Sequence, residues 1–257
     1  MSPIKFPKSA DMTFTKNMVK RHKLVTHLDR YLSKEVTDFE FVYEPKVGDD
    51  AWHPSGHCTP SVTDLYEIAT GQVAQKDWGT SMLKTFMVGH FWHQLLQKAV
   101  LDLGFAEPEA IERRGIEDWS DSEDPLSDPL PFHWATGAGD VAPCSIPGYG
   151  DYVIDFKTQN SRSFKETSLP GWCADKYEAQ INIYMDFFDL ENGLIVCIDK
   201  DSPHGMKEFT FNRNQPLIEA IYAKWRFVSG CLDSDEAPTA FDDEEFSLSG
   251  LFTGPVA

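Results

Sequence analysis

The sequence predicts an α/β fold in which a central mixed β-sheet is flanked by helices. Apolar residues recur at helical spacing along three segments, at about 78–103, 173–190 and 214–230. Short runs rich in β-branched and aromatic residues fall between them, bounded by Gly and Pro, which is typical of strands. Helices therefore alternate with two pairs of strands, and this order favours a mixed sheet covered by helices.

The length and composition are those of a globular protein with a substantial core. The 257 residues are 41% hydrophobic and 13% aromatic, enough for one large domain or two small ones. We expect a single domain over residues 1–257, with a helical N-terminal segment at about 1–50 and an acidic C-terminal tail at about 233–257. No stretch approaches the ~18 apolar residues of a membrane span, and no signal peptide is evident. The five cysteines are scattered without a C-x-x-C pair, so we expect a reducing, cytoplasmic setting.

The charge is strongly negative and unevenly distributed. Lys and Arg number 23 against 41 Asp and Glu, a net charge of −18, which alone argues against a nucleic-acid binder. Two runs without a basic residue, at 117–128 and 233–245, hold six and seven acids, or 13 of the 18 excess charges. Both are rich in Ser, Pro and Asp, and we predict that they form a loop and a tail. They are solvated segments, a contact for a partner, or a means of keeping nucleic acid from other surfaces.

The first elements are predicted from helical spacing and capping residues. Residues 1–10 indicate an extended lead-in, and apolar residues at near-helical spacing predict a helix over about 13–34. The other face of that helix is basic and is either solvated or in contact with phosphate. Ser61 and Asp64 resemble a capping box that starts a helix over 61–69, and Gly71 is a plausible stop.

The later elements follow the same logic. Four strands are predicted from apolar runs bounded by turn residues, at 132–142, 150–158, 193–199 and 206–211. A loop at 143–150, with Pro and Gly, joins the first pair. Gly104 closes the long helix before it. Asn214 can cap the last helix, which is expected to stop at Gly230.

Three residues spaced four apart line one face of the long helix: Gly89, His93 and Gln97. Gly is unfavourable by about 1 kcal/mol in a helix interior, so Gly89 indicates the close approach of another element. His93 lies in the middle of this polar stripe on an otherwise apolar helix. A lone histidine there is more often a satisfied core residue than a ligand, and His90 is offset from the stripe.

The two central strands carry acidic residues that the chain can bring together. Gly137 and Gly139 precede Asp140, so the backbone can approach a ligand closely there. Side chains alternate along a strand, so Asp155 and Lys157 project from one face, where burial is costly unless it is compensated. Two carboxylates on adjacent strands repel each other, and together they favour a hard divalent cation that takes oxygen ligands.

The helix at 173–190 contributes one more polar stripe. Gln180 and Tyr184 lie four residues apart, and Lys176 continues the same face. Taken alone, this stripe is an ordinary polar helix face.

Together these marks resemble the PD-(D/E)XK nuclease superfamily, specifically its RecB-like exonuclease branch of the phage and CRISPR-associated type. The branch is similar in four motifs: G-x-x-x-H-x-x-x-Q on a helix, G-x-x-D on a strand, D-x-K on the next strand and Q-x-x-x-Y on a later helix. In this sequence they are carried by Gly89, His93, Gln97, Gly137, Asp140, Asp155, Lys157, Gln180 and Tyr184. With the similar His53-Pro54-Ser55 segment, the resemblance spans about residues 53–190.

The resemblance implies a restriction-endonuclease-like core and a Mg/Mn-dependent DNA exonuclease, a phosphodiester hydrolase of phage or bacterial recombination or repair. Mg²⁺ or Mn²⁺ would be held by His93, Asp140, Asp155 and the backbone carbonyl of Phe156. Catalysis would depend on Asp140, Asp155, Lys157, Gln180 and Tyr184. An imidazole ligand makes Mn²⁺ comparatively more favourable than an all-oxygen site does.

The sequence departs from the branch in its cysteines and its charge. Many relatives hold an iron–sulfur cluster with one early and three late cysteines. Cys58 matches the early one, but Cys231 is the only cysteine after residue 197, so we expect no cluster. The strongly acidic balance is also unusual and puts tight non-specific duplex binding in doubt.

Several alternatives stay open. The expected partners are DNA, as single strands or duplex ends, and a single-strand annealing or other recombination protein, with no membrane, in the cytoplasm of a bacterial host if the protein is phage-encoded. The alternative function is a catalytically silent nuclease-fold module that binds nucleic acid or a partner protein, and a third is an interaction subunit that works through its acidic runs. The sequence does not decide strand preference, polarity, exo- or endonucleolytic action, or oligomeric state.

Overall fold

The structure is a computed structural model of the whole chain. It describes residues 23–33, 39–41, 49–73, 80–119, 131–167, 175–202 and 205–256. The predicted lead-in at 1–10, the first part of the predicted helix at 13–34 and most of the acidic run at 117–128 lie outside the described residues.

Five strands form one mixed sheet whose spatial order follows the chain: β1 (Ile111–Asp118), β2 (Trp134–Ile146), β3 (Gly150–Gln159), β4 (Asn192–Asp199) and β5 (Met206–Asn212). Strands β3 and β4 pair in parallel, and the other neighbours pair antiparallel. The mixed sheet flanked by helices is therefore confirmed. Strand β1 was not predicted, because it is an edge strand with a single buried residue, Gly115, and lacks the apolar run by which a central strand is found.

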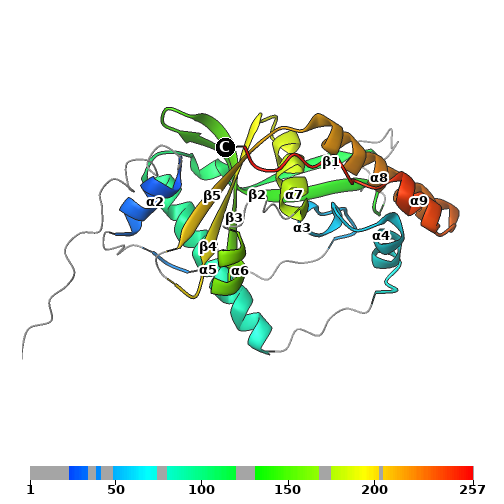
Figure 1. The fold of residues 1–257 in the computed structure, drawn as a ribbon, viewed down its shortest axis with the longest axis horizontal. Coiled ribbons are helices and arrows are strands. Elements are labelled where there is room, and N and C mark those ends of the chain that lie inside the picture. The colour runs from blue at the N-terminus through cyan, green and yellow to red at the C-terminus, as the bar shows by residue number, and fades with distance from the viewer. Residues whose placement is uncertain are drawn as a thin grey trace, which may run out of the picture.

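Helices cover both faces of the sheet (Figure 1). They are α2 (Val25–Leu32), α3 (Pro54–His57), α4 (Val62–Ala69), α5 (Thr80–Asp102), α6 (Ser161–Glu166), α7 (Asp175–Phe187), α8 (Gln215–Ser234) and α9 (Ala240–Glu245), with a 3-10 turn η1 (Pro108–Ala110). Helices α2 and α5 pack on the face that carries Phe156. Helix α7 packs on the opposite face, through Ile181 and Tyr184. Outside α7 lies a further apolar layer, built by α4 and α8 with Trp52.

Most predicted helix ends are confirmed. The Ser61 side chain accepts a hydrogen bond from the Asp64 backbone N–H at the start of α4, and Gly71 follows this helix with φ +70°. Gly104 closes α5 in the same left-handed conformation. The Asn214 side chain accepts from the Leu217 N–H and caps α8.

Two predicted ends were wrong. Strand β2 continues through Pro143 to Ile146, because the register shifts between Val141 and Cys144 and the irregular pairing accommodates a residue without an N–H. Helix α8 passes Gly230 and ends only before Asp235, which takes the left-handed conformation at φ +55°. A Cβ at Gly230 would contact nothing, so no packing requires the glycine, and the helix continues through it despite a cost of about 1 kcal/mol.

The predicted acidic tail is instead folded onto the domain. Asp233 belongs to α8, and α9 contains four of the acids and begins with a Thr239 capping box. The Asp243 carboxylate accepts hydrogen bonds from the backbone and hydroxyl of Thr63 on α4. The last described residue, Val256, pairs with Thr210 of β5. None of the helices in the described ranges is long and apolar enough to cross a bilayer.

Candidate active site

One face of α5 contacts the centre of the sheet at successive turns. A Cβ on Gly89 would lie only 3.2 Å from Thr158 Oγ1, so a glycine lets the helix approach β3 closely. One turn later, His93 Nδ1 lies 3.0 Å from Asp140 Oδ1. One further turn on, Gln97 Nε2 lies 3.3 Å from the backbone oxygen of Asp140. The stripe that was predicted from its spacing is therefore a polar seam between α5 and strands β2 and β3.

The two predicted carboxylates lie where β2 and β3 part. The antiparallel ladder between these strands ends with the pair Val141 and Ile154, so Asp140 and Asp155 hold the next opposing positions. There the Asp140 carboxylate replaces a ladder acceptor, since its Oδ2 accepts the Phe156 backbone N–H at 2.6 Å. Asp140 is 6% exposed and Asp155 4% exposed, so two acids are buried side by side at the point of divergence.

Asp155 and Lys157 share one face of β3, as the strand alternation predicted. Lys157 Nζ donates to Asp155 Oδ1 at 3.0 Å. It also lies 2.7 Å from Oδ2, yet that oxygen is buried and makes no hydrogen bond of acceptable geometry. The ammonium further lies 5.4 Å from the centre of the Tyr177 ring on α7, in a cation–π arrangement. One oxygen of Asp155 is thus left without a hydrogen bond inside a polar cluster.

The electrostatics of the cluster follow from burial and from the pairing of opposite charges. Burial acts to raise the pKa of Asp140, but His93 and Lys157 outweigh it and hold that pKa below its ordinary value. Burial raises the pKa of Asp155, and the nearby Asp140 charge adds to this while Lys157 opposes it. Burial acts to lower the pKa values of His93 and Lys157, but Asp140 and Asp155 outweigh it and raise both. The two acids therefore titrate differently, as expected for neighbouring carboxylates.

Helix α7 carries the remaining predicted pair, Gln180 and Tyr184. It packs on the face of the sheet from which Lys157 projects. Gln180 Nε2 donates to the Tyr184 hydroxyl at 3.0 Å, and both side chains are buried. A Cβ on Gly137 would lie 2.9 Å from Tyr184 Cε1 and 3.0 Å from Pro54 Cδ, so this glycine makes room for the tyrosine ring. Burial raises the pKa of Tyr184 well above its ordinary value, and the Asp155 carboxylate contributes. Lys176 lies on the exposed start of α7 and stacks on Tyr177.

The side chains present fit a divalent cation in their chemistry. The donors are two buried carboxylates and an imidazole, and one carboxylate oxygen, Asp155 Oδ2, lacks a hydrogen bond. As arranged, however, they form two separate pairs, His93 with Asp140 and Lys157 with Asp155. Among the described residues, no three His, Cys, Asp or Glu side chains converge as a ready set of ligands. The ligand role predicted for the Phe156 carbonyl stays a prediction.

Two residues of this region were not found from the sequence. Tyr177 approaches Lys157 from α7, and its only signal was its place beside Lys176 in the polar stretch. Glu112 accepts a hydrogen bond from Gln97 Nε2 at 2.8 Å. No signal could have found Glu112, because it lies on the unpredicted strand β1.

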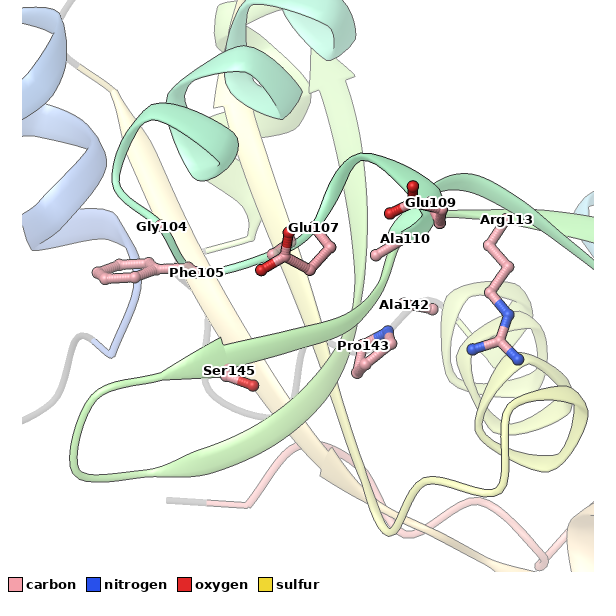
Figure 2. Close-up of a pocket in the computed structure, with 10 residues that line it drawn as sticks. Gly104, Phe105, Glu107, Glu109, Ala110, Arg113, Ala142, Pro143 and Ser145 are labelled. Carbon is pink, nitrogen blue, oxygen red and sulfur yellow. The ribbon is translucent and has the colours of Figure 1, made fainter.

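A cavity of about 290 Å³ lies between the loop after α5 and strand β2. Figure 2 shows the loop after α5, with Phe105 and Glu107, on one side of the cavity, and Pro143 of β2 on the other. Arg113 also lines it, with its guanidinium 5.2 Å from the centre of the Phe188 ring. The candidate catalytic and metal-binding side chains are absent from the cavity lining, so the chemistry predicted from the motifs is not assigned to this cavity.

Comparisons with known proteins show only distant likenesses. No protein-family profile and no curated protein matches the sequence. Among the solved structures that resemble it, SSO0001 is 17% identical, with a TM-score of 0.46 over 84% of this chain and 89% of that one. LHK-Exo in complex with dAMP, an alkaline exonuclease from Laribacter hongkongensis, is 14% identical, with a TM-score of 0.45 over 72% and 89%. A phage-related exonuclease from Haemophilus somnus is 11% identical, with a TM-score of 0.37 over 68% and 82%. These values are too low to indicate a shared activity.

Proposed function

We propose that this chain is a divalent-metal-dependent deoxyribonuclease that hydrolyses DNA phosphodiester bonds, acting at DNA ends as an exonuclease in phage or bacterial recombination or repair. The observation that carries the proposal is the burial of Asp140 and Asp155 side by side where β2 and β3 part, with Lys157 against Asp155. Burying like charges is costly, and a hydrophobic pair would stabilise the fold at least as well. A cluster of this kind is understandable if it serves chemistry. The choice of DNA, and of its ends, rests on the four sequence motifs.

In this proposal Asp140, Asp155, His93 and the Phe156 carbonyl hold Mg²⁺ or Mn²⁺. When bound, the ion acts as a Lewis acid on the scissile phosphate and lowers the pKa of a coordinated water. Because the pKa of Lys157 is raised, its side chain is cationic at neutral pH and steadies negative charge on the phosphate. The raised pKa of Tyr184 keeps its hydroxyl protonated, so with Gln180 it orients the lysine or the DNA strand rather than acting as a base.

The test is cleavage of end-labelled single-stranded and double-stranded DNA with Mg²⁺, Mn²⁺ or a chelator. We expect metal-dependent release of nucleotides from an end by the wild-type protein. Asp155→Asn and Lys157→Ala should abolish it without unfolding the protein, whereas Lys165→Ala, on the exposed face of α6, should leave it intact. Cleavage that survives in both active-site variants would reject the proposed residues. DNA binding without cleavage by the wild-type protein under all three conditions would instead favour a silent nuclease-fold module.

A further inference from the structure

Glu112 has a strained backbone at a position directly across from Asp140. In the register that pairs Ile111 with Val141 and Arg113 with Gly139, Glu112 faces Asp140 on β2. Its φ is +48°, a conformation that costs an L-residue roughly 1 kcal/mol or more. The other described non-glycine residues with positive φ lie in turns, whereas Glu112 lies inside a strand. Backbone strain within a strand is retained only where the surrounding contacts hold it.

One contact that accompanies this strain is a hydrogen bond between Glu112 and the α5 seam. Gln97 is 5% exposed, and its Nε2 lies 2.8 Å from Glu112 Oε1 and 3.3 Å from the Asp140 backbone oxygen. Both partners are acceptors, and only the NH₂ end of an amide has two hydrogens to give. A flipped amide would place its oxygen against a carboxylate and a carbonyl. The Glu112 carboxylate and the Asp140 carbonyl therefore both select the NH₂ end of Gln97.

Asp140 is consequently held at two points from one helix. His93 contacts its carboxylate, and Gln97 contacts its main-chain carbonyl from the next turn of α5. Carboxylate orientation sets how well a ligand can meet a metal ion, and outer contacts of this kind govern metal affinity.

We infer that Glu112 is a positioning residue of the proposed metal site, which acts through the Gln97 amide on the backbone of Asp140. The inference rests on the proposed function, since it assigns Glu112 a part in holding a ligand of that site. Glu112 does not touch the substrate or the ion in this role. It holds the amide, together with the Asp140 carbonyl itself, in the orientation that supports Asp140.

The first test is the variant Glu112→Gln, which keeps the size of the side chain but offers Gln97 a donor as well as an acceptor, so residue 112 no longer enforces one orientation of the Gln97 amide. We expect the affinity for Mn²⁺, measured by calorimetry without DNA, to fall about tenfold or more. The kcat of DNA cleavage should fall with KM unchanged. Because Glu112 is exposed, the thermal unfolding temperature should stay close to that of the wild-type protein. Glu117→Gln, on the same strand, is the matched control and should change neither affinity nor kcat.

A second variant separates a role through Gln97 from an independent effect of charge. Gln97→Met removes both hydrogen bonds at nearly constant volume, and it should weaken Mn²⁺ binding at least as much as Glu112→Gln does. If Glu112 acts through Gln97, the double variant should bind no more weakly than Gln97→Met alone. Wild-type affinity in Glu112→Gln, or additive losses in the double variant, would overturn the inference. A wild-type protein that neither binds Mn²⁺ nor cleaves DNA would overturn the proposed function itself, and the inference with it.

Discussion

The Asp140 carboxylate accepts the backbone N–H of Phe156 at 2.6 Å, across the point where β2 and β3 separate. A side-chain oxygen here takes the place that a strand carbonyl holds elsewhere in an antiparallel ladder. The N–H favours the charged form of Asp140, and together with His93 and Lys157 it holds the pKa of this buried acid below its ordinary value. This contact thus marks the point of strand divergence and adds to the larger effects of His93 and Lys157 on the ionised state of Asp140.

Asp140→Asn should separate the charge of this residue from its shape. The Asn oxygen can still accept the Phe156 N–H, and its NH₂ group can face His93, so the fold should be kept. If Asp140 is a direct ligand as proposed, its replacement should weaken Mn²⁺ binding by more than the ~10–100-fold typical of outer contacts. Calorimetry with Mn²⁺ measures the expected loss of metal affinity, and a thermal unfolding scan checks that the fold is kept. Asp151→Asn, an exposed acid near the other end of β3, is the control. Unchanged Mn²⁺ affinity would remove Asp140 from the proposed ligands.

Mn²⁺ affinity should rise with pH across the neutral range. The Asp140 carboxylate raises the pKa of His93 above 6.5 despite its burial, so protons compete with a metal ion for this imidazole near neutrality. Deprotonation above the raised pKa frees the ligand, and the affinity therefore increases as the pH rises above ~6.5. In His93→Asn this increase should be much smaller and the affinity lower. Calorimetric titrations at a series of pH values decide this, and parallel pH profiles for the two proteins would exclude His93 as a ligand.

The stability of the fold should fall in mild acid because of His57. Its Nδ1 accepts the His53 backbone N–H at 2.8 Å, and burial followed by the neighbouring His53 lowers its pKa from 6.5 to about 4. The unfolded chain binds this proton near pH 6.5, but the folded one does so only near 4. The contribution of the neutral His57 imidazole to the stability of the fold is therefore complete above pH 6.5 and is lost as the pH falls toward 4. The loss is roughly 3 kcal/mol at most.

His57→Asn tests this contribution, because the Asn oxygen can accept the same N–H and does not titrate. The difference in unfolding free energy between the two proteins should shrink as the pH falls through the interval between the two pKa values. Urea unfolding at a series of pH values measures it. A difference that stays constant across the interval would show that His57 does not titrate as described.

The sequence could predict the α5 seam because helix faces are encoded locally. Gly89, His93 and Gln97 repeat every fourth residue, so their common face follows from the helix period alone. The shared face of Asp155 and Lys157 follows from strand alternation in the same way. That these two sets meet at one point followed only from their resemblance to known motifs, since no local rule places α5 against β3.

What the sequence could not predict depends on long-range pairing. The contact of Gln97 with Glu112 needs the register of β1 against β2, and β1 carries too few apolar residues to be found. A run of acids is typical of a solvated tail or of a contact for a partner, and neither interpretation predicts a folded segment. In the structure Asp243 binds Thr63, a residue 180 positions earlier in the chain, which no pattern near either residue indicates.

The C-terminal segment should be required for stability through Glu178 of α7. This residue is 0% exposed, and its carboxylate accepts hydrogen bonds from the backbone and hydroxyl of Thr253, at 2.7 and 3.0 Å, and from the Gly254 N–H at 2.9 Å. All three of these groups are donors, so Glu178→Gln would turn an NH₂ group toward donors or leave one of them without an acceptor. We expect a loss of about 2–3 kcal/mol in the free energy of unfolding. Glu219→Gln, exposed on α8, should change it little.

Removal of residues 247–257 should destabilise the protein at least as much, because it takes away these three donors to the buried Glu178 carboxylate and the core residue Leu248. Glu178 lies two positions before Gln180, so the damage falls on the helix that carries the Gln180–Tyr184 pair. A truncated chain that loses activity would therefore report a disturbed α7 rather than a lost partner contact. Urea unfolding of the truncated chain, with and without Glu178→Gln, measures how much of the lost stability comes from the contact between Glu178 and this segment. If Glu178→Gln costs nothing more once the segment is gone, the loss in that variant acts through this contact. Wild-type stability of the truncated chain would refute the expectation.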